Sequence, residues 1–361
     1  MQAVLIIQAV LLVAIAAAMW FLPLAVAPSI AFGVRIPPER RTDAAVLAAT
    51  RGYRLGIGVS ALICLALLFL IQWPPVLLSA SVLIFLILFL VDFLVARSRV
   101  LRAKEAGHWF SGTPEGAAAA TSPDSGQGAF PWSYLLPALI LIVLTVIVGI
   151  IRFPALPDRI PAHFTLTGAV NRYTTKSWGS VLFPVWTQLF VTGLITVLSF
   201  VTWRSPRQLD PARPETSLQR SWQFRRRLIR LLLLLSAAVD LTLLLAGLLT
   251  WNVLTPGPAT LAMLLAIPLL AAAVLVVVSF RMGQEGVRIP AQEPAATGLI
   301  ARDDDRLWKA GLVYWNPKDP ALIVPKRFGI GYTFNFGHWL AWAVLLALIL
   351  TPVVITHLAH G

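Results

Sequence analysis

Charged residues are scarce in this sequence, and cysteine is almost absent. Only 12% of the 361 residues are charged and 58% are hydrophobic, a balance far from that of soluble domains. The single cysteine, Cys64, cannot form an intrachain disulfide. The sequence has no His-Glu-x-x-His pair, no phosphate-binding loop ending in Lys-Ser/Thr, no Gly-x-Ser-x-Gly and no Cys pair. We therefore expect a protein that is not an enzyme and needs no cofactor.

Long hydrophobic runs take the place of catalytic motifs. Roughly eight of them are long enough to cross a bilayer as helices. They lie near residues 4–26, 55–73, 76–96, 133–153, 180–203, 228–251, 259–280 and 339–357. The expected fold is all-α, a polytopic membrane helix bundle with a small β-hairpin-containing segment before the last helix. The lipid bilayer is the first expected partner.

The loops between these runs alternate in charge. Arginine and lysine gather in the first, third, fifth and seventh loops, within residues 35–54, 97–104, 204–230 and 281–327. The second and sixth loops carry no basic residue. Basic loops stay in the cytoplasm, so both termini are expected outside a bacterial inner membrane. The net charge of +13, including the run Arg225-Arg226-Arg227, is attributed to lipid-facing topology anchors and not to nucleic acid.

By span and loop, the chain divides into six expected segments. They are a three-helix membrane block (1–104), a flexible cytoplasmic linker (105–131), a two-helix unit with an outward loop at 154–178 (132–204), a helical pair (205–280), a cytoplasmic segment with short strands (281–337) and a last membrane helix (338–361). The first run lacks the basic start of a signal peptide, so it is expected to stay as a span. The linker is rich in Gly, Ala, Ser, Thr and Pro and has too little apolar surface to order itself.

One short sequence occurs twice. Gly33-Val34-Arg35-Ile36-Pro37 returns as Gly286-Val287-Arg288-Ile289-Pro290, each time just after a span. A distant repeat with two matching cytoplasmic loops and a chance match of common residues both remain open.

The loop between the fourth and fifth spans is the only expected outward loop with length and polarity. Three prolines exclude a helix at its start, residues 160–166 have strand composition, and Gly168 permits a turn. Its candidate site residues are Pro157, Asp158, Arg159, Ile160, Pro161, His163, Phe164, Gly168, Asn171 and Lys176. Alternatively, the prolines and Gly168 only shape the loop, and His163 forms a hydrogen bond within it.

The pattern Pro-x-x-Ile-Pro-x-His-Phe at 157–164, with Gly168 and Lys176 between two spans, resembles the uncharacterised domain of the Sdp toxin-immunity (SdpI) membrane proteins. The resemblance covers about residues 133–203, and the chain has more spans than that family. It implies a toxin-immunity or signalling role, with a peptide toxin or signal outside the cell and a regulator in the cytoplasm as partners.

The segment before the last span carries a second motif. Its residues are Trp308, Gly311, Tyr314, Asn316, Pro317, Asp319, Pro325, Arg327, Gly331 and Asn335. This motif is similar to a small domain of unknown function often found in the same bacterial membrane proteins. We expect strands at 312–315 and 321–324 joined by a turn at 316–319, a third strand at 331–336, and Asn335 as the cap of the last helix. Alternatively, Trp308, Tyr314 and Trp315 are interfacial anchors.

Asp240 lies near the middle of a span, where an ionised carboxylate costs roughly 2.5–3.5 kcal/mol. A proton- or ion-coupled residue and a neutral, hydrogen-bonded carboxyl both remain open. Asp92, near the end of the third span, is a weaker candidate. His357 and His360 are three residues apart but have no evident third ligand, so no metal site is expected.

Three functions follow from these observations. The leading interpretation is a non-enzymatic membrane protein of toxin-immunity or signal-sensing type. The alternative is a secondary transporter with Asp240 as its coupling residue, which the short repeat would also suit. An intramembrane enzyme is supported only by scattered His and Asp residues.

Overall fold

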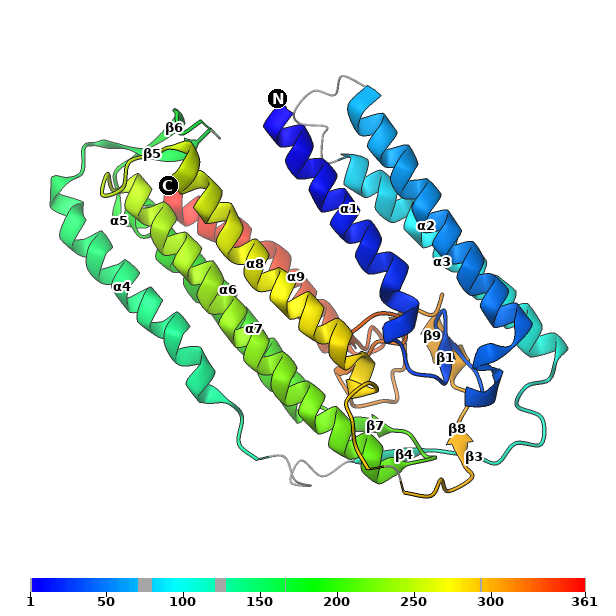
Figure 1. Cartoon of the computed structure of the whole chain (residues 1–361). Helices are drawn as coiled ribbons and strands as arrows, with labels where there is room; N and C mark the ends of the chain where they lie inside the picture. Colours follow the sequence, from blue (N-terminus) through cyan, green and yellow to red (C-terminus); the bar gives the residue numbers. More distant parts are fainter. Residues whose placement is uncertain (1, 71–79, 121–127, 166, 293, 361) are drawn as a thin grey trace. The chain divides into compact units, whose positions relative to one another are not determined.

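The computed structural model describes residues 2–70, 80–120, 128–165, 167–292 and 294–360. Eight helices in these ranges are long and apolar enough to cross a membrane, which confirms the predicted polytopic helical fold. The helices are α1 (Gln2–Ala25), α2 (Ala44–Leu70), α3 (Ala80–Ala106), α4 (Leu136–Arg152), α5 (Trp178–Val181), α6 (Phe183–Arg204), α7 (Pro214–Thr250), α8 (Pro258–Met282) and α9 (Trp339–His360) (Figure 1). The short α5 precedes α6 and is not one of the eight.

The strands are short and pair two by two. The pairs are β1 (Ile30–Ala31) with β2 (Val34–Arg35), β3 (Glu115–Gly116) with β8 (Ile300–Ala301), β4 (Ala118–Ala120) with β7 (Arg207–Leu209), β5 (Arg159–Phe164) with β6 (Val170–Thr175), β9 (Trp308–Lys309) with β10 (Val313–Tyr314), and β11 (Ile323–Pro325) with β12 (Tyr332–Phe334). The β3–β8 pair is parallel, and the other pairs are antiparallel.

Three helices extend beyond the spans predicted from hydropathy. α2 begins at Ala44 and not near residue 55, α3 continues to Ala106 and not only to about residue 96, and α7 begins at Pro214 and not near residue 228. Many of the basic residues assigned to loops therefore lie on helix ends. Arginine and lysine are good helix formers, so a helix can continue where its apolar stretch stops.

The chain forms two compact units. Unit 1 comprises residues 1–121, 206–221 and 280–337, and unit 2 comprises residues 122–205, 222–279 and 338–361. The expected linker therefore contributes structure to unit 1, because β3 and β4 lie within it and pair with β8 and β7. Residues 121–127 of the linker lie outside the described residues.

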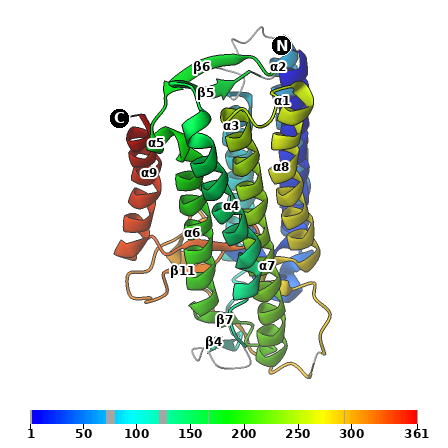
Figure 2. The ribbon, with the colours of Figure 1, turned by 90° about the vertical axis from the view of Figure 1, so that its left-hand side faces the viewer.

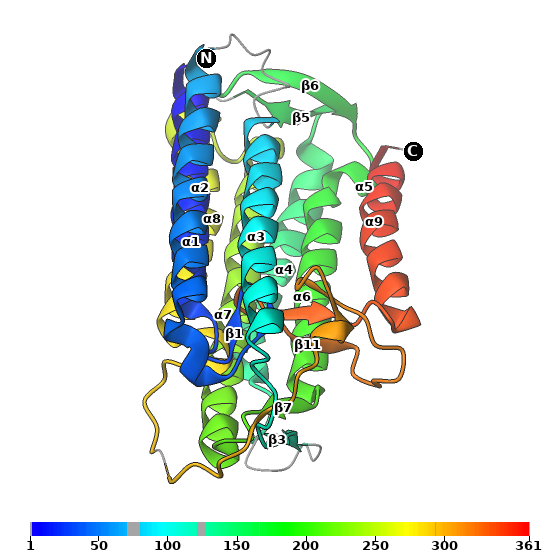
Figure 3. The same ribbon diagram turned by 90° about the vertical axis from the view of Figure 1, so that its right-hand side faces the viewer.

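In unit 1, α1, α2 and α3 lie side by side (Figure 3). α2 and α3 approach closely at Gly56, where an added Cβ would collide with the carboxylate of Asp92. An aromatic cluster includes a residue of α3: the ring centroids of Phe93 and Phe328 are 4.6 Å apart, and those of Phe32 and Phe328 are 5.7 Å apart. These rings join α3, the β1–β2 turn and the segment before α9 in one core.

In unit 2, α4 packs against α6, and α9 packs against α5 and α6. Figure 2 shows α4, α6 and α7 side by side, with the β5–β6 hairpin at one end of them. α7 and α8 form the predicted helical pair, joined by the turn at residues 251–257. In α8, no residue of the most apolar stretch is buried in the described part of the chain.

Candidate functional site

The β5–β6 hairpin is the first candidate site. It is antiparallel, with Ile160 opposite Thr174 and an irregular register around His163. Gly168 forms the predicted turn with φ +91°, a conformation that glycine adopts without strain. A Cβ on Gly168 would lie 3.0 Å from the backbone of Pro256 and Gly257. Glycine at this position therefore lets the tip of the hairpin touch the α7–α8 turn.

The hairpin is anchored on a small apolar core of unit 2. Ile160 is fully buried and packs in one cluster with Leu156, Val181 and Trp251. Trp251 Nε1 donates a hydrogen bond to Val181 O at 3.1 Å. Because buried tryptophan needs a partner for its N–H, this bond fixes the ring below the hairpin.

Lys176 closes the base of the hairpin. Its backbone N donates to Asp158 O at 2.8 Å, and its Nζ donates to Leu156 O at 2.8 Å. Nζ also lies 4.9 Å from the centre of the Phe153 ring, a cation–π distance. The Lys176 ammonium is thereby held at the base and not on the exposed strands.

The other polar side chains of the hairpin are exposed. His163 Nδ1 lies 2.6 Å from Asn171 Oδ1. Because an amide oxygen only accepts, Nδ1 carries the proton, and Nε2 stays available to solvent or a partner. The predicted motif is split into buried residues (Ile160, Pro161, Gly168), half-buried residues (Phe164, Lys176) and exposed residues (Pro157, Asp158, Arg159, His163, Asn171).

A buried polar cluster lies where α4, α6 and α7 meet, and we call it the Asp240 cluster: Thr145, Gln188, Thr192 and Asp240. Asp240 is fully buried, and its Oδ2 accepts a hydrogen bond from Thr192 Oγ1 at 2.7 Å. The Gln188 amide donates to Asp240 O at 2.8 Å and to Thr145 Oγ1 at 3.0 Å. Among the described residues, Asp240 Oδ1 and Gln188 Oε1 have no hydrogen-bond partner.

The sequence identified Asp240 but not the residues around it. Gln188 and Thr192 are one helical turn apart and therefore share a face of α6. Polar side chains inside membrane spans usually face the interior of a bundle. On that ground Gln188 and Thr192 could have been predicted from the sequence to point inward. Asp92 is different, because it is only half-buried and accepts a hydrogen bond from Ser60 Oγ at 3.1 Å.

The motif before α9 is organised by Asn335, which is fully buried. Its Oδ1 accepts from Asn316 N and Gly337 N, both at 3.0 Å, and its Nδ2 donates to Asn316 O at 2.8 Å and Asp319 O at 3.1 Å. The prediction that Asn335 caps the last helix is therefore wrong, because the turn at 316–319 uses its whole amide. His338 directly precedes α9, and its Nδ1 accepts a hydrogen bond from the backbone N of Leu340 at 3.2 Å.

The strand pairing predicted for this motif is also wrong. The expected partners, 312–315 and 321–324, belong to different pairs, since β10 pairs with β9 and β11 pairs with β12. Tyr314 bridges to Asn335 instead. Trp308 and Tyr314 are 3% and 2% exposed, with ring centroids 5.1 Å apart. They are therefore core residues and not interfacial anchors, whereas Trp315 is exposed.

Gly311 and Gly331 of the same motif have positive φ, at +72° and +99°. Gly311 lies against Gly33, where an added Cβ would meet Gly33 Cα at 3.2 Å. Among the other motif residues, Pro325 ends β11 and Pro317 is exposed in the turn at 316–319. Tyr314 Oη lies 2.9 Å from Asp319 Oδ2, and burial raises the pKa of the Tyr314 hydroxyl to about 12.

Three consecutive aspartates, 303–305, form ion pairs with three basic residues of unit 1. The pairs are Arg35–Asp304, Lys104–Asp303, Lys104–Asp305, Arg327–Asp304 and Arg327–Asp305. Burial alone would raise the pKa of Asp305, but Arg327 and Lys104 outweigh it and hold that pKa below its usual value. This network was not predicted, although an acidic run inside a basic segment was a visible signal.

The two Gly-Val-Arg-Ile-Pro copies begin with the same backbone turn, although Val34–Arg35 then form β2 and residues 287–288 do not form a strand. Phe32 and Gly33 have φ of +48° and +72°, and Glu285 and Gly286 have φ of +52° and +75°. Two successive residues with positive φ form the same kind of tight turn. The similarity in backbone conformation therefore includes the residue before each copy, although these two residues, Phe32 and Glu285, are chemically unlike.

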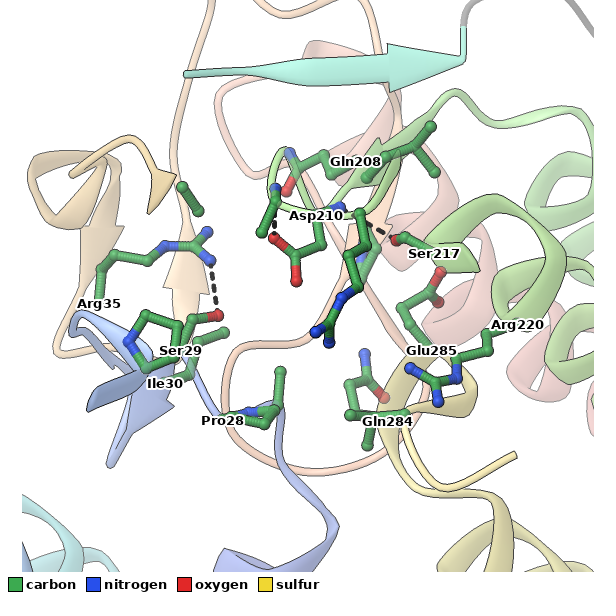
Figure 4. A pocket seen from close by; sticks show the side chains of 18 of the residues that line it. Pro28, Ser29, Ile30, Arg35, Gln208, Asp210, Ser217, Arg220, Gln284 and Glu285 are labelled. Atoms are coloured by element: carbon green, nitrogen blue, oxygen red, sulfur yellow. Dashed lines mark hydrogen bonds between the residues drawn. The ribbon is translucent and has the colours of Figure 1, made fainter. Parts of the chain in front are cut away.

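Unit 1 contains a cavity of about 500 Å³ beside these two turns (Figure 4). Arg35 of the first copy lines it, and so do Gln284 and Glu285, which directly precede the second copy. Gln284 is buried, donates to Lys326 O at 3.1 Å and to Gly331 O at 2.8 Å, and accepts from Gly331 N at 2.7 Å. Gln284 thereby fixes the segment that follows β11 against the second turn.

No group of three or more His, Cys, Asp or Glu side chains that could hold a metal ion occurs in the described part of the chain. His357 is exposed on α9, and the side chain of His360 lies outside the described residues.

Two protein-family models match parts of the chain. The domain of unknown function DUF1648 matches residues 140–187, which include the β5–β6 hairpin, and the family of unknown function DUF5808 matches residues 317–342, which include β11, β12 and the start of α9. No curated protein and no solved structure matches the chain. The first match contains the whole hairpin motif, whereas the second begins at residue 317 and covers only the later part of the motif before α9. Neither description names an activity.

Proposed function

We propose that this chain is a non-enzymatic protein of toxin-immunity or signal-sensing type in the bacterial cytoplasmic membrane, and that its β5–β6 hairpin binds a peptide or another envelope partner outside the cell. The observation that carries this proposal is the hairpin itself, which is anchored at Ile160 and exposes Arg159, Arg172 and Tyr173. The resemblance of residues 157–164 to the Sdp toxin-immunity family supports it.

An extended peptide suits this hairpin for two reasons. Among the described residues β5 and β6 form a two-stranded sheet, so the outer edge of each strand can accept another strand through main-chain hydrogen bonds. The exposed arginines and the half-exposed ring of Tyr173 add contacts for acidic and apolar side chains of such a peptide.

A cytoplasmic regulator would bind unit 1 in this proposal. The described lining of its cavity contains five basic and three acidic side chains, a difference of two positive charges that suits an acidic partner. The ion pairs of residues 303–305 and the Gln284 contacts hold this surface in one shape. The two turns at residues 32–33 and 285–286 lie beside this cavity, and with them the two Gly-Val-Arg-Ile-Pro copies.

Survival of a deletion strain tests the immunity proposal. Cells that lack the protein should be killed by conditioned medium of the parent strain, and the wild-type protein should restore survival. The double variant Arg159→Ser/Arg172→Ser should fail to restore it while its membrane abundance stays normal. The matched control Arg302→Ser/Arg306→Ser, which also replaces two exposed arginines, should restore survival fully. Equal rescue by both variants would remove the hairpin from the function.

A secondary transporter is the second candidate, and the open Oδ1 of the buried Asp240 carboxylate favours it. Coupled transport should appear as a proton or Na⁺ flux in proteoliposomes. The flux should disappear in Asp240→Asn and persist in Asp92→Asn, the same substitution on another span. A protein that confers survival without any flux would exclude this candidate.

A further inference from the structure

The hydrogen bonds of the Asp240 cluster leave an excess of acceptors. Both N–H groups of the Gln188 amide are used, on Asp240 O and Thr145 Oγ1. The Thr192 hydroxyl donates to Asp240 Oδ2, and the Thr145 hydroxyl donates to Leu141 O at 2.7 Å. Every donor of these side chains is therefore committed. Asp240 Oδ1 and Gln188 Oε1 still accept from no described residue.

The orientation of the Gln188 amide follows from its partners. Asp240 O is a backbone carbonyl that only accepts, so the amide atom 2.8 Å from it must be the nitrogen. A flipped amide would set two acceptors against each other. Gln188 Oε1 therefore belongs to the same unsatisfied set as Asp240 Oδ1, and both side chains are fully buried.

The carboxylate of Asp240 also has no ion-pair partner in the described part of the chain. Within α4 and α6, the helices packed around it, the charged residues are Arg152 and Arg204, each in the last turn of its helix. On α7 the preceding charged residue is Arg230, ten residues or about 15 Å along the axis. Among the described residues, no basic side chain therefore pairs with Asp240 in the middle of its span.

A small cation would both occupy the unpaired acceptor Asp240 Oδ1 and neutralise the carboxylate charge. Unpaired buried acceptors and an isolated buried charge are costly in a medium of low polarity. Hard cations take oxygen ligands from carboxylates, amide carbonyls and hydroxyls, and sites for Na⁺ or protons in membrane proteins lie near the middle of the bilayer. We infer that the Asp240 cluster binds one monovalent cation, Na⁺ or a proton, at Asp240 Oδ1.

This inference deepens the transport candidate without depending on it, because a bound cation can stabilise unit 2 without being carried across the membrane. The two failures are distinguishable. Cation binding without flux would exclude transport and leave the site, whereas a flux that survives Asp240→Asn would remove Asp240 from the path.

Carbodiimide labelling of the wild-type, full-length protein in detergent tests the site. A hydrophobic carbodiimide reacts with protonated carboxyl groups in apolar surroundings, and the modified residue is located by mass spectrometry. If Na⁺ is the occupant, Na⁺ at about ten times its Kd should slow the labelling of Asp240 about tenfold relative to choline at equal ionic strength. If the proton is the occupant, Asp240 should react in both salts, and its labelling should slow as the pH rises. Asp92, a carboxylate within another span, is the internal control and should react at the same rate in both salts.

Thermal unfolding with Asp240→Asn separates the two cations. If Na⁺ is the occupant, Na⁺ should raise the Tm of the wild type and of Asp92→Asn by a few degrees and leave Asp240→Asn unchanged. If the proton is the occupant, Na⁺ should have no effect, and acidification should raise the Tm of the wild type but not of Asp240→Asn. Neither effect, or equal effects in Asp240→Asn and Asp92→Asn, would overturn the inference.

Discussion

Arg225 is fully buried, and its guanidinium group caps the C-terminal end of another helix, α6. Its Nη1 donates to Thr202 O at 3.0 Å and to Ser205 O at 2.7 Å. These carbonyls lie at the C-terminus of α6, where helix carbonyls lack intrahelical donors and the helix dipole favours a cation. Pro206 has no N–H to offer Thr202 O. The predicted lipid-facing role of the run 225–227 is therefore wrong for Arg225.

Replacing Arg225 by Leu should lower the free energy of unfolding by about 1–3 kcal/mol, the cost of leaving Ser205 O unpaired, whereas Thr202 O keeps the hydrogen bond from Ser205 N. The neighbouring Arg226 is exposed, and Arg226→Leu should stay within about 0.5 kcal/mol of the wild type. Denaturation of the purified protein, followed by tryptophan fluorescence, measures both. Similar losses in the two variants would contradict the capping role.

Individual residues were predictable where their own chemistry singles them out. Asp240 stands out because a carboxylate is costly in a span, and Gly168 because a turn needs it. The partners of Asp240 were not predictable in the same way, since Gln188 and Thr192 gain their meaning only when α6 faces α7. Hydropathy gives the length of a span but not the face that it turns inward.

The acidic run 303–305 decides the electrostatics of the segment before α9. It binds Arg35 from β2, Lys104 from α3 and Arg327 after β11. Asp305 is 14% exposed, so its ion pairs are screened less than surface pairs. The run therefore joins three distant parts of unit 1 through charge.

This network predicts loss of stability in acid. The folded pKa of Asp305 is below its ordinary value, so its contribution is complete above the unfolded pKa, roughly 3.9, and is lost as the pH falls through the lower folded value. Asp305→Asn should therefore be less stable than the wild type at pH 7, and the gap should narrow below about pH 4. Denaturation of both proteins at pH 7 and pH 3 measures this.

The control for this prediction is Glu105→Gln, which removes an exposed carboxylate at the end of α3 that forms no ion pair with the described residues. It should leave the stability at both pH values close to that of the wild type. A gap between wild type and Asp305→Asn that stays constant with pH would show that the side chain acts through its shape and not its charge.

Elements with local partners were predictable, and elements with distant partners were not. The β5–β6 hairpin has both strands and its turn within one short stretch of sequence. By contrast, β3 pairs with β8, which lies far away in the sequence. The prediction of a hairpin at 312–324 was wrong because Asn335, from a third segment, binds the turn at 316–319. Composition alone cannot choose among such partners.

At the scale of the whole molecule, eight helices are long and apolar enough to cross a membrane, and eight crossings would place both termini on the same side. Thr167 at the tip of the hairpin and Lys318 in the turn before α9 are separated by α6, α7 and α8, so three crossings would put them on opposite sides. The basic residues around unit 1 predict that Lys318 faces the cytoplasm and Thr167 the outside. The two positions are exposed and therefore accessible to a reagent.

Cysteine labelling tests this topology directly. Cys64 is buried and is the only cysteine in the sequence, so Cys64→Ala gives a background without thiols. In intact cells a membrane-impermeant maleimide should label Thr167→Cys, and it should label Lys318→Cys only after the membrane is opened. The reverse result would remove the outward hairpin and with it the peptide-binding proposal.

Labelling of both positions from one side would show that one of the three helices does not cross. Because the apolar stretch of α8 has no buried residue in the described part of unit 2, α8 would be the first helix to re-examine.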